Sequence, residues 1–180
     1  MSKNARCNFV NYWKLRAVSI LLMLILTASS IMAGYLQDIS PEEASSLYNE
    51  ATSYFEGLVV NGDVEATAFN MLRDFIPVVL VCNAPFVGPF TAIYTAYSAG
   101  YTAKAERIAT GNDTFASLFL DPANILQLLA IALAGGEGVL LSYVFWRKEK
   151  VENLETLAVI ILEMSLTILS VVFEAFEALF

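Results

Sequence analysis

The sequence predicts an all-α, polytopic helical membrane protein with about five membrane helices, and three observations support this class. Of its 180 residues, 57% are hydrophobic, more than a soluble domain of this length carries. Two uncharged stretches, residues 17–36 and 75–103, reach the roughly 20 residues that an α-helix needs to cross a bilayer. Proline and glycine interrupt one of these stretches, which predicts a broken hairpin inside a single membrane domain of residues 1–180.

Composition also excludes several classes of function. The net charge of -8, with no basic stripe to offset it, argues against nucleic-acid binding. The chain has no histidine, the commonest ligand of zinc, copper and haem iron, so we expect no metal and no cofactor. Cys7 precedes the first span and Cys82 lies in an apolar run, so we expect no disulfide. Without a nucleophile–base pair or phosphate loop, we expect no enzyme activity.

The first span is predicted at residues 17–36, which carry no charge and follow a basic segment without acids. A secretory signal peptide is the alternative interpretation. Ile31 would stand where a cleavage site requires a small residue, which favours a retained anchor with its basic end in the cytoplasm.

Residues 37–65 form an acidic segment that we expect on the outer side. Ser40 as N-cap, Pro41 at the first helical position and Glu43 three residues after the cap predict a helix start. Asn61-Gly62 predicts the turn that ends this helix. Its apolar face comprises Leu47, Tyr48, Ala51, Tyr54, Phe55 and Leu58. The helix either docks a partner or lies on its own bundle or the headgroups, and we prefer the second interpretation.

Residues 66–103 are predicted to form the broken hairpin. The uncharged run from Phe75 to Ala103 contains a cluster of helix-breaking residues at its centre. These are Pro85, Gly88 and Pro89, and they follow Asn83. One interrupted span is the alternative. The helical rise from Asp74 to Asn83 is about 13 Å, which puts the turn near mid-membrane, so a re-entrant hairpin and two full spans both fit.

Arg73 and Asp74 enter this hairpin side by side. Adjacent helical residues point in different directions, so we expect them not to pair with each other. Arg73 is expected to extend outward or to meet an acid from another helix.

The remaining segments follow in order. Asn112-Asp113-Thr114 is an N-glycosylation sequon in the first of them, a weak sign of an outer location. Asp121-Pro122 predicts the start of the next helix. The segments are an outer loop at 104–117, a span at 118–145, a cytoplasmic basic loop at 146–152 and a span at 153–175.

The distribution of basic residues favours the hairpin over a single interrupted span. With a hairpin, the N-terminus lies inside, the C-terminus lies outside, and Arg73, Lys104 and Arg107 are the outer bases. The other bases are then cytoplasmic, namely Lys3, Arg6, Lys14, Arg16, Arg147, Lys148 and Lys150. A single span would move the last three outside, which the positive-inside rule disfavours.

Two blocks of sequence resemble the stage II sporulation protein M family in its archaeal-type form. One block is Asn83-Ala84-Pro85-Phe86-Val87-Gly88-Pro89 with Tyr97-Ser98-Ala99-Gly100-Tyr101. The other runs from Asp121-Pro122 through Gln127, Ala130 and Ala134 to Glu137-Gly138, with Gln127 where the family pattern has glutamate. The resemblance implies a multi-pass protein of the cell membrane, without known catalytic chemistry, that acts as a membrane partner of other proteins.

Two intramembrane acids and one amide are the candidate polar site. Glu137 and Glu163 would form a proton or cation path if they faced each other. The alternative, which we prefer, is bonding to backbone or to hydroxyls such as Ser142, Ser165 or Thr167, or pairing with another subunit. Asn83 either caps carbonyls that the prolines orphan, which we prefer, or binds an ion or substrate.

Small residues at Gly135 and Gly138 form a candidate packing surface, either against the hairpin or against another chain. Two functions remain open. The preferred one is a non-catalytic scaffold or accessory subunit that packs in the lipid bilayer against other membrane protein subunits. The alternative is a small-solute or ion transporter or channel built on the broken hairpin.

Overall fold

The computed structural model describes residues 9–149 and 153–179, which form helices and no strands. Three helices are long and apolar enough to cross a membrane, over Tyr12–Leu36, Pro122–Arg147 and Leu154–Glu177. The all-helical class is thus confirmed. The cysteine and bases predicted at Cys7, Lys3, Arg6 and Lys150 lie outside the described residues. The helices are α1 (Phe9–Leu36), α2 (Pro41–Leu58), α3 (Val64–Cys82), α4 (Gly88–Thr110), α5 (Ser117–Leu120), α6 (Pro122–Arg147) and α7 (Asn153–Glu177).

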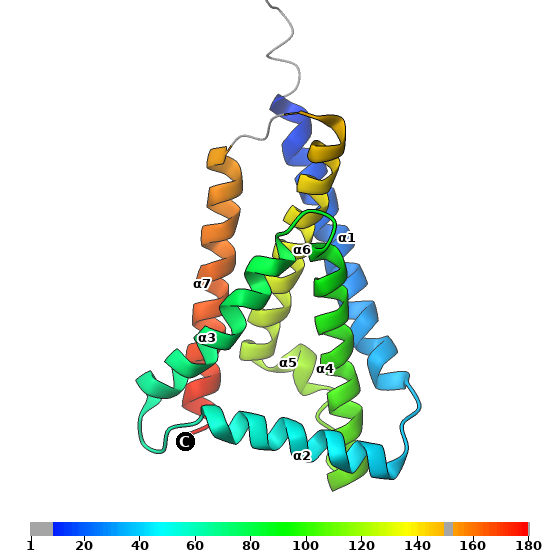
Figure 1. Cartoon of the computed structure of the whole chain (residues 1–180), viewed down its shortest axis with the longest axis vertical. Coiled ribbons are helices and arrows are strands. Elements are labelled where there is room, and N and C mark those ends of the chain that lie inside the picture. Colours follow the sequence, from blue (N-terminus) through cyan, green and yellow to red (C-terminus); the bar gives the residue numbers. More distant parts are fainter. Residues whose placement is uncertain (1–8, 150–152, 180) are drawn as a thin grey trace, which may run out of the picture.

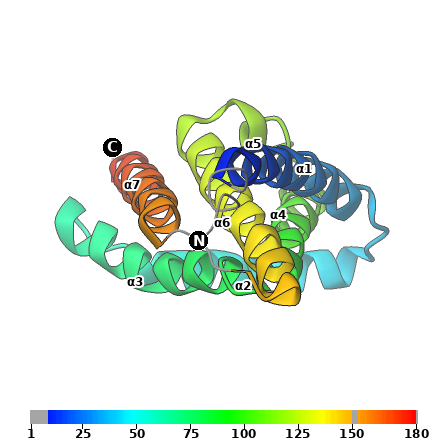
Figure 2. The ribbon, with the colours of Figure 1, turned by 90° about the horizontal axis from the view of Figure 1, so that it is seen from above.

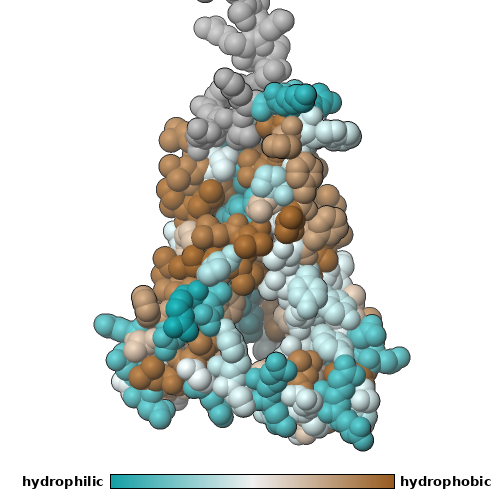
Figure 3. Space-filling view, in the orientation of Figure 1, coloured by the Kyte–Doolittle hydropathy of each residue, from teal (hydrophilic) through white to brown (hydrophobic). Residues whose placement is uncertain are grey.

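The long helices α1, α6 and α7 run along the long axis of the molecule, and α2 lies across the end where α1 finishes (Figure 1). Seen from above, α6 lies between α7 on one side and α1 with α4 on the other (Figure 2). Hydrophobic residues dominate the upper part of the surface, and hydrophilic residues gather around α2 at the lower end (Figure 3). This separation is typical of a bundle partly embedded in lipid.

The predicted helix caps are confirmed. The Ser40 hydroxyl accepts the Glu43 N–H, and the Asp121 carboxylate accepts the Ala123 N–H at 2.8 Å. Gly62 has a φ of 78°, as the turn after α2 requires. The Glu43 side chain does not return to the cap, because its carboxylate accepts the Tyr101 hydroxyl of α4 at 2.8 Å and so ties α2 to α4.

The broken hairpin folds as α3, a short turn and α4. Phe86 in the turn has a φ of 65°, a strained value for a residue with a side chain, and its N–H donates to Ser142 Oγ at 2.6 Å. Ser142 lies five residues before Arg147, so the turn stops about 8 Å short of the end of α6. The turn therefore contacts α6 well beyond its midpoint, deeper than the mid-membrane position predicted from the rise of α3.

The expectation that Arg73 and Asp74 do not pair is wrong, although Arg73 extends outward as predicted. Its Nε lies 3.3 Å from Asp74 Oδ1, because the long exposed side chain can bend back to its neighbour. Asp74 also accepts the hydroxyl of Tyr54 from α2. This hydrogen bond raises the pKa of Tyr54, since it favours the protonated phenol beside a carboxylate.

The closest helix crossing joins α1 to α4. A Cβ atom added to Gly34 would lie 2.1 Å from the Tyr97 carbonyl oxygen, and one added to Gly100 would lie 1.9 Å from the Ile31 carbonyl oxygen. Only glycine permits this approach of two backbones, which is how helices pack closely in lipid.

Candidate functional site

Four polar side chains between the middle and the C-terminal end of α7 lie on one face that points into the bundle. Glu163, Thr167, Ser170 and Glu174 recur at alternating intervals of four and three residues, so they lie on a single helical face. Glu163 and Ser170 are fully buried, Thr167 is nearly so, and Glu174 is half-buried. We call this row, with the α6, α3 and α1 side chains that bond to it or continue it, the polar seam.

At the α2 end, the polar seam joins α7 to the start of α6. Gln127 Nε2 donates to Glu174 Oε2 at 2.8 Å, and the Ser170 hydroxyl donates to the Ala123 carbonyl at 2.9 Å. The Gln127 amide supplies a donor that a carboxylate at this position would lack beside Glu174.

In the middle of the seam, Asn83 meets Glu163. Asn83 Nδ2 donates to Glu163 Oε2 at 2.6 Å and to the Val79 carbonyl at 3.1 Å. The bond to Val79 confirms that the asparagine caps a carbonyl at the broken end of α3. Asn83 Oδ1 and Glu163 Oε1 are both buried without a hydrogen-bond partner.

At the far end of the seam, Arg16 of α1 holds two acids. Its Nε and Nη2 atoms lie 2.8 and 2.9 Å from the two carboxylate oxygens of Glu137 on α6. Its Nη1 atom lies 2.8 Å from Glu155, and the Thr156 hydroxyl donates to Glu137 at 2.8 Å. The side chain of Arg16 is 1% exposed and that of Glu137 is 0% exposed, so this is a fully buried ion pair.

Glu137 and Glu163 do not face each other, so the condition for the less preferred alternative, a shared proton or cation path, is not met, and each acid binds a different partner. The preferred alternative, bonding to hydroxyls, holds for Glu137 through Thr156, but the three hydroxyls named as examples do not bind either carboxylate. Ser142 and Ser165 donate to the carbonyls of Gly138 and Ile161, and Thr167 donates to the main-chain carbonyl of Glu163 rather than to its carboxylate. Within a helix, serine and threonine hydroxyls find the carbonyl four residues earlier at little cost.

Sequence analysis missed Arg16, Glu155 and Thr156, and it placed Arg16 among the cytoplasmic bases. The helical spacing of residues before and within the first span could have shown that Arg16 faces the bundle. The buried face of α1 continues at helical spacing from Arg16 through Ser19 and Met23 to Thr27. Helix α1 therefore begins before the uncharged run and carries its arginine into the bundle.

The predicted packing residues lie inside the chain rather than on a partner surface. A Cβ atom on Gly138 would lie 2.7 Å from the Cys82 carbonyl oxygen, 3.1 Å from Pro89 Cδ and 3.3 Å from the Ala84 carbonyl oxygen. Gly135 is equally close to Met23 and Ala92, and Gly88 packs on the last residue of α3. These small residues hold α6 against the hairpin. Pro85, by contrast, is exposed at the turn.

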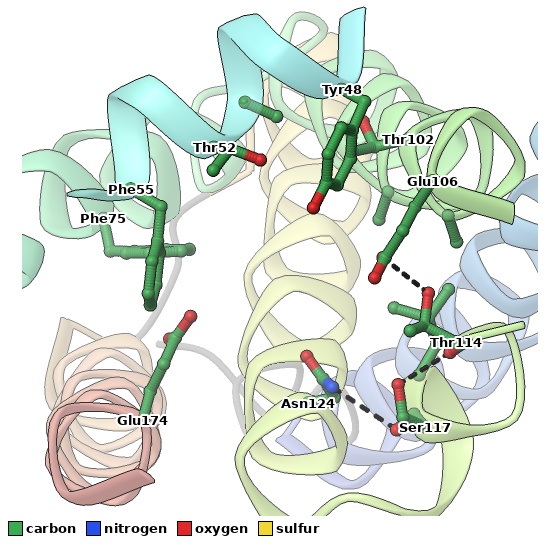
Figure 4. A pocket seen from close by; sticks show the side chains of 14 residues that line it. Tyr48, Thr52, Phe55, Phe75, Thr102, Glu106, Thr114, Ser117, Asn124 and Glu174 are labelled. Atoms are coloured by element: carbon green, nitrogen blue, oxygen red, sulfur yellow. Dashed lines mark hydrogen bonds between the residues drawn. The ribbon is translucent and has the colours of Figure 1, made fainter. Parts of the chain in front are cut away.

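A cavity of about 650 Å³ opens at the α2 end of the seam, bounded by α2, α3, α4, α6, α7 and the loop after α4. The surface is hollowed in this region (Figure 3). Glu174 points into the cavity from α7, opposite Tyr48 and Glu106 (Figure 4). A second cavity of about 240 Å³ shares Ala99 and Asn124 with it and extends to Gln127 and Ile131 of α6. The larger volume falls within the range of small-molecule sites.

The described lining of these cavities contains Glu106 and Glu174 but no lysine or arginine. The bases near this end are engaged elsewhere. Arg107 contacts Asp113 at 3.4 Å and the Tyr35 hydroxyl at 2.6 Å, and Lys104 lies 5.4 Å from the Tyr35 ring. Glu106 accepts a hydrogen bond from the Thr114 hydroxyl, and Glu174 accepts one from the Gln127 amide. Both acids are therefore bound by neutral donors rather than by a base. The cavity is thus an acidic space whose walls mix apolar, hydroxyl and amide side chains.

Among the described residues, no three His, Cys, Asp or Glu side chains gather as metal ligands. No family model, curated protein or solved structure matches this chain. The resemblance to the stage II sporulation protein M family therefore stays a prediction. Function is inferred here from the polar seam and the cavity.

Proposed function

We propose that this chain is a multi-pass, non-enzymatic protein of the cell membrane that takes a small cationic solute into the acidic cavity and moves it across the bilayer. The single observation that carries the proposal is a solute-sized cavity whose Glu106 and Glu174 have no basic counterpart in the described lining. A cationic solute would supply the missing charge.

The polar seam supports movement rather than binding alone. Ionisable side chains in a membrane span are costly unless they have a role, and α7 carries two, Glu163 and Glu174, on the face that points into the bundle. The seam leads from the cavity at Glu174 toward Arg16 and Glu137 at the other end. The charged pair there would close the path on that side.

The orientation we propose is N-terminus inside and C-terminus outside, with the cavity outside and the hairpin re-entrant. The two ends of the described chain lie at opposite ends of the molecule (Figure 1). Because Arg16 is buried, it no longer counts as a cytoplasmic base under the positive-inside rule. The bases Lys14, Arg147 and Lys148 still lie at the end of the molecule opposite Lys104 and Arg107. The membrane would then contain three full spans and the broken pair.

Uptake into proteoliposomes tests the proposal, with tetraethylammonium and methylammonium as probes. Glu174→Gln removes a cavity charge while keeping the shape of the side chain, and we expect it to abolish uptake. Glu177→Gln is the matched control, because Glu177 lies on the same helix, exposed and outside the cavity. Equal uptake by both variants, or uptake no greater than in protein-free liposomes, would refute the proposal.

A second candidate is the accessory-subunit role that sequence analysis preferred. One observation favours it, namely the exposed acids Glu42, Glu50 and Glu56 on α2, which suit a basic partner. Reversing these charges to lysine should remove partners that co-purify in mild detergent, as identified by mass spectrometry. Recovery of the same partners with the reversed charges would exclude this role for α2. A kinship with the stage II sporulation protein M family would fit this role.

A further inference from the structure

Asn83 and Glu163 form a buried pair in which one oxygen atom of each side chain lacks a hydrogen-bond donor. Both side chains are buried, with Glu163 at 0% exposed. Asn83 Nδ2 is fixed by two acceptors, the Val79 carbonyl and Glu163 Oε2. Rotating the amide by half a turn would place its oxygen against both acceptors, so the positions of Nδ2 and Oδ1 are fixed. That oxygen and Glu163 Oε1 both lack a donor.

The charge on a buried Glu163 carboxylate would also lack a counter-ion. The nearest buried base on the seam, Arg16, has its Nε, Nη1 and Nη2 atoms occupied by Glu137, Glu155 and Thr156. A lone buried carboxylate with one hydrogen bond is strongly disfavoured. A metal ion would need several more oxygen ligands than the two free oxygens provide.

We propose that Asn83 and Glu163 form a proton-binding site in which one proton resides on Glu163 Oε1 and is donated to Asn83 Oδ1. The proton neutralises Glu163 and gives both orphaned oxygens a partner. Asn83 Nδ2 and Glu163 Oε2 already form the other half of this amide–carboxylic acid ring. The site joins the broken end of α3 to α7, so loss of the proton disfavours contact between the hairpin and α7.

This inference deepens the proposed function and rests on it in one step only, the use of the proton as the ion coupled to solute movement. Glu163 and Glu174 share one face of α7, with Thr167 and Ser170 between them. A solute that binds at Glu174 and a proton that binds at Glu163 therefore act on the same helix. Release of the proton would let α7 and the hairpin separate.

The charged and titratable groups near Glu163 in the described chain are few. The charge of Glu137 on α6 acts on Glu163, and the charge of Glu163 acts in turn on the Cys82 thiol at the end of α3. Arg16 already neutralises Glu137. Cys82 is a buried free thiol. A spectral or labelling change with pH at this position is therefore assigned to Glu163 when a substitution of Glu163 alone removes it.

Infrared difference spectroscopy of the full chain in lipid nanodiscs tests the site directly, between acidic and alkaline buffers. We expect a carbonyl band of a buried protonated carboxyl group that Glu163→Gln removes and Glu177→Gln leaves unchanged. Asn83→Ala should shift this band to higher frequency, because Glu163 Oε2 loses its donor. A spectrum in which Glu163→Gln removes no protonated-carboxyl band would overturn the proposal.

Thiol labelling provides a second measurement that does not depend on a spectral assignment. In a Cys7→Ser background, Cys82 is the remaining cysteine, and its buried thiol, next to Asn83, reports opening of the core around the end of α3. We expect labelling by N-ethylmaleimide to rise more steeply with pH than in the same background with Glu163→Gln. The second variant shows how much of the rise comes from thiol ionisation alone. Identical pH profiles would contradict the site.

The two proposals fail in different ways. A protonated Glu163 band without uptake of either ammonium probe would leave the proton site standing and refute transport. Uptake that is lost in Glu174→Gln, together with the absence of the band, would leave transport standing and refute the proton site.

Discussion

Arg16 on α1 and Glu137 on α6 form a two-point ion pair inside the bundle, with Nε–Oε2 and Nη2–Oε1 distances of 2.8 and 2.9 Å. Glu155 and Thr156 at the start of α7 bind the same pair. The pair therefore joins the three helices long enough to span a membrane at one end of the molecule. It fixes their rotation relative to one another, because each side chain must face the others.

Removing one partner of this ion pair should strongly destabilise the folded protein. We expect Arg16→Met to lower the free energy of unfolding by about 3–5 kcal/mol, because it leaves Glu137 buried without a counter-charge. Titration with SDS in detergent micelles measures this value. Lys14→Met, at an exposed position on the same helix, is the control and should change little. Adding Glu137→Leu to Arg16→Met should restore much of the loss, and a double variant no more stable than the single one would contradict this account.

The crossing of α1 and α4 should not tolerate a single added methyl group. Gly100→Ala would place a Cβ 1.9 Å from the Ile31 carbonyl oxygen, and backbone atoms cannot move aside as a side-chain end can. We expect a loss of at least about 1–3 kcal/mol in the same unfolding assay. Gly57→Ala is the matched control, since nothing lies within 4 Å of its Cβ position. Similar stabilities for the two variants would show that the helices do not cross this closely.

Filling the cavity should block solute without unfolding the protein. Ala99 on α4 lines both cavities, so Ala99→Phe should occupy the space where they join. We expect uptake of tetraethylammonium to fall while the unfolding curve stays close to that of the parent chain. Ala109→Phe adds the same ring at an exposed position of α4 and should leave uptake unchanged. If both variants took up tetraethylammonium as well as the parent chain, the solute would bind elsewhere.

The contact of α2 with α3 should depend on pH through Tyr54. Its raised pKa means that the contribution of the phenol is present below its ordinary pKa of 10.0 and is lost as pH rises through the folded value. The difference in ultraviolet absorbance between the parent chain and Tyr54→Phe isolates its titration. We expect Asp74→Asn to lower the midpoint, because the carboxylate that accepts the hydroxyl is gone. An unchanged midpoint would mean that the two side chains do not meet.

Local features were predictable from the sequence because their causes lie within a few residues. Ser40 and Asp121 cap the helices that follow them, and Asn83 caps the carbonyl of Val79 at the broken end of α3. Side-chain chemistry near a helix end decides these contacts almost alone. The small-residue face around Gly138 was also predictable, although its partner, the hairpin of the same chain, was one of two alternatives.

Contacts between helices were not predictable to the same degree. Gly34 of α1 lies close to α4, and Gly100 of α4 lies close to α1. Both contacts depend on where the two helices cross, and an isolated glycine in an apolar run does not reveal that position. The cavity beneath α2 arises because the helices diverge toward that end (Figure 1). Neither the crossing nor the divergence leaves a periodic signal in one helix.

The sequence by itself predicted a helical membrane chain with a polar residue at the break of the hairpin, and three helices in the described residues are long and apolar enough to cross a membrane. Only the tertiary structure decided which buried charges meet. Glu137 and Glu163 were both evident as intramembrane acids, yet one faces Arg16 and the other faces Asn83. The physical reason is that a helix fixes the spacing of its own side chains, whereas its rotation and tilt against its neighbours follow from packing of the whole bundle.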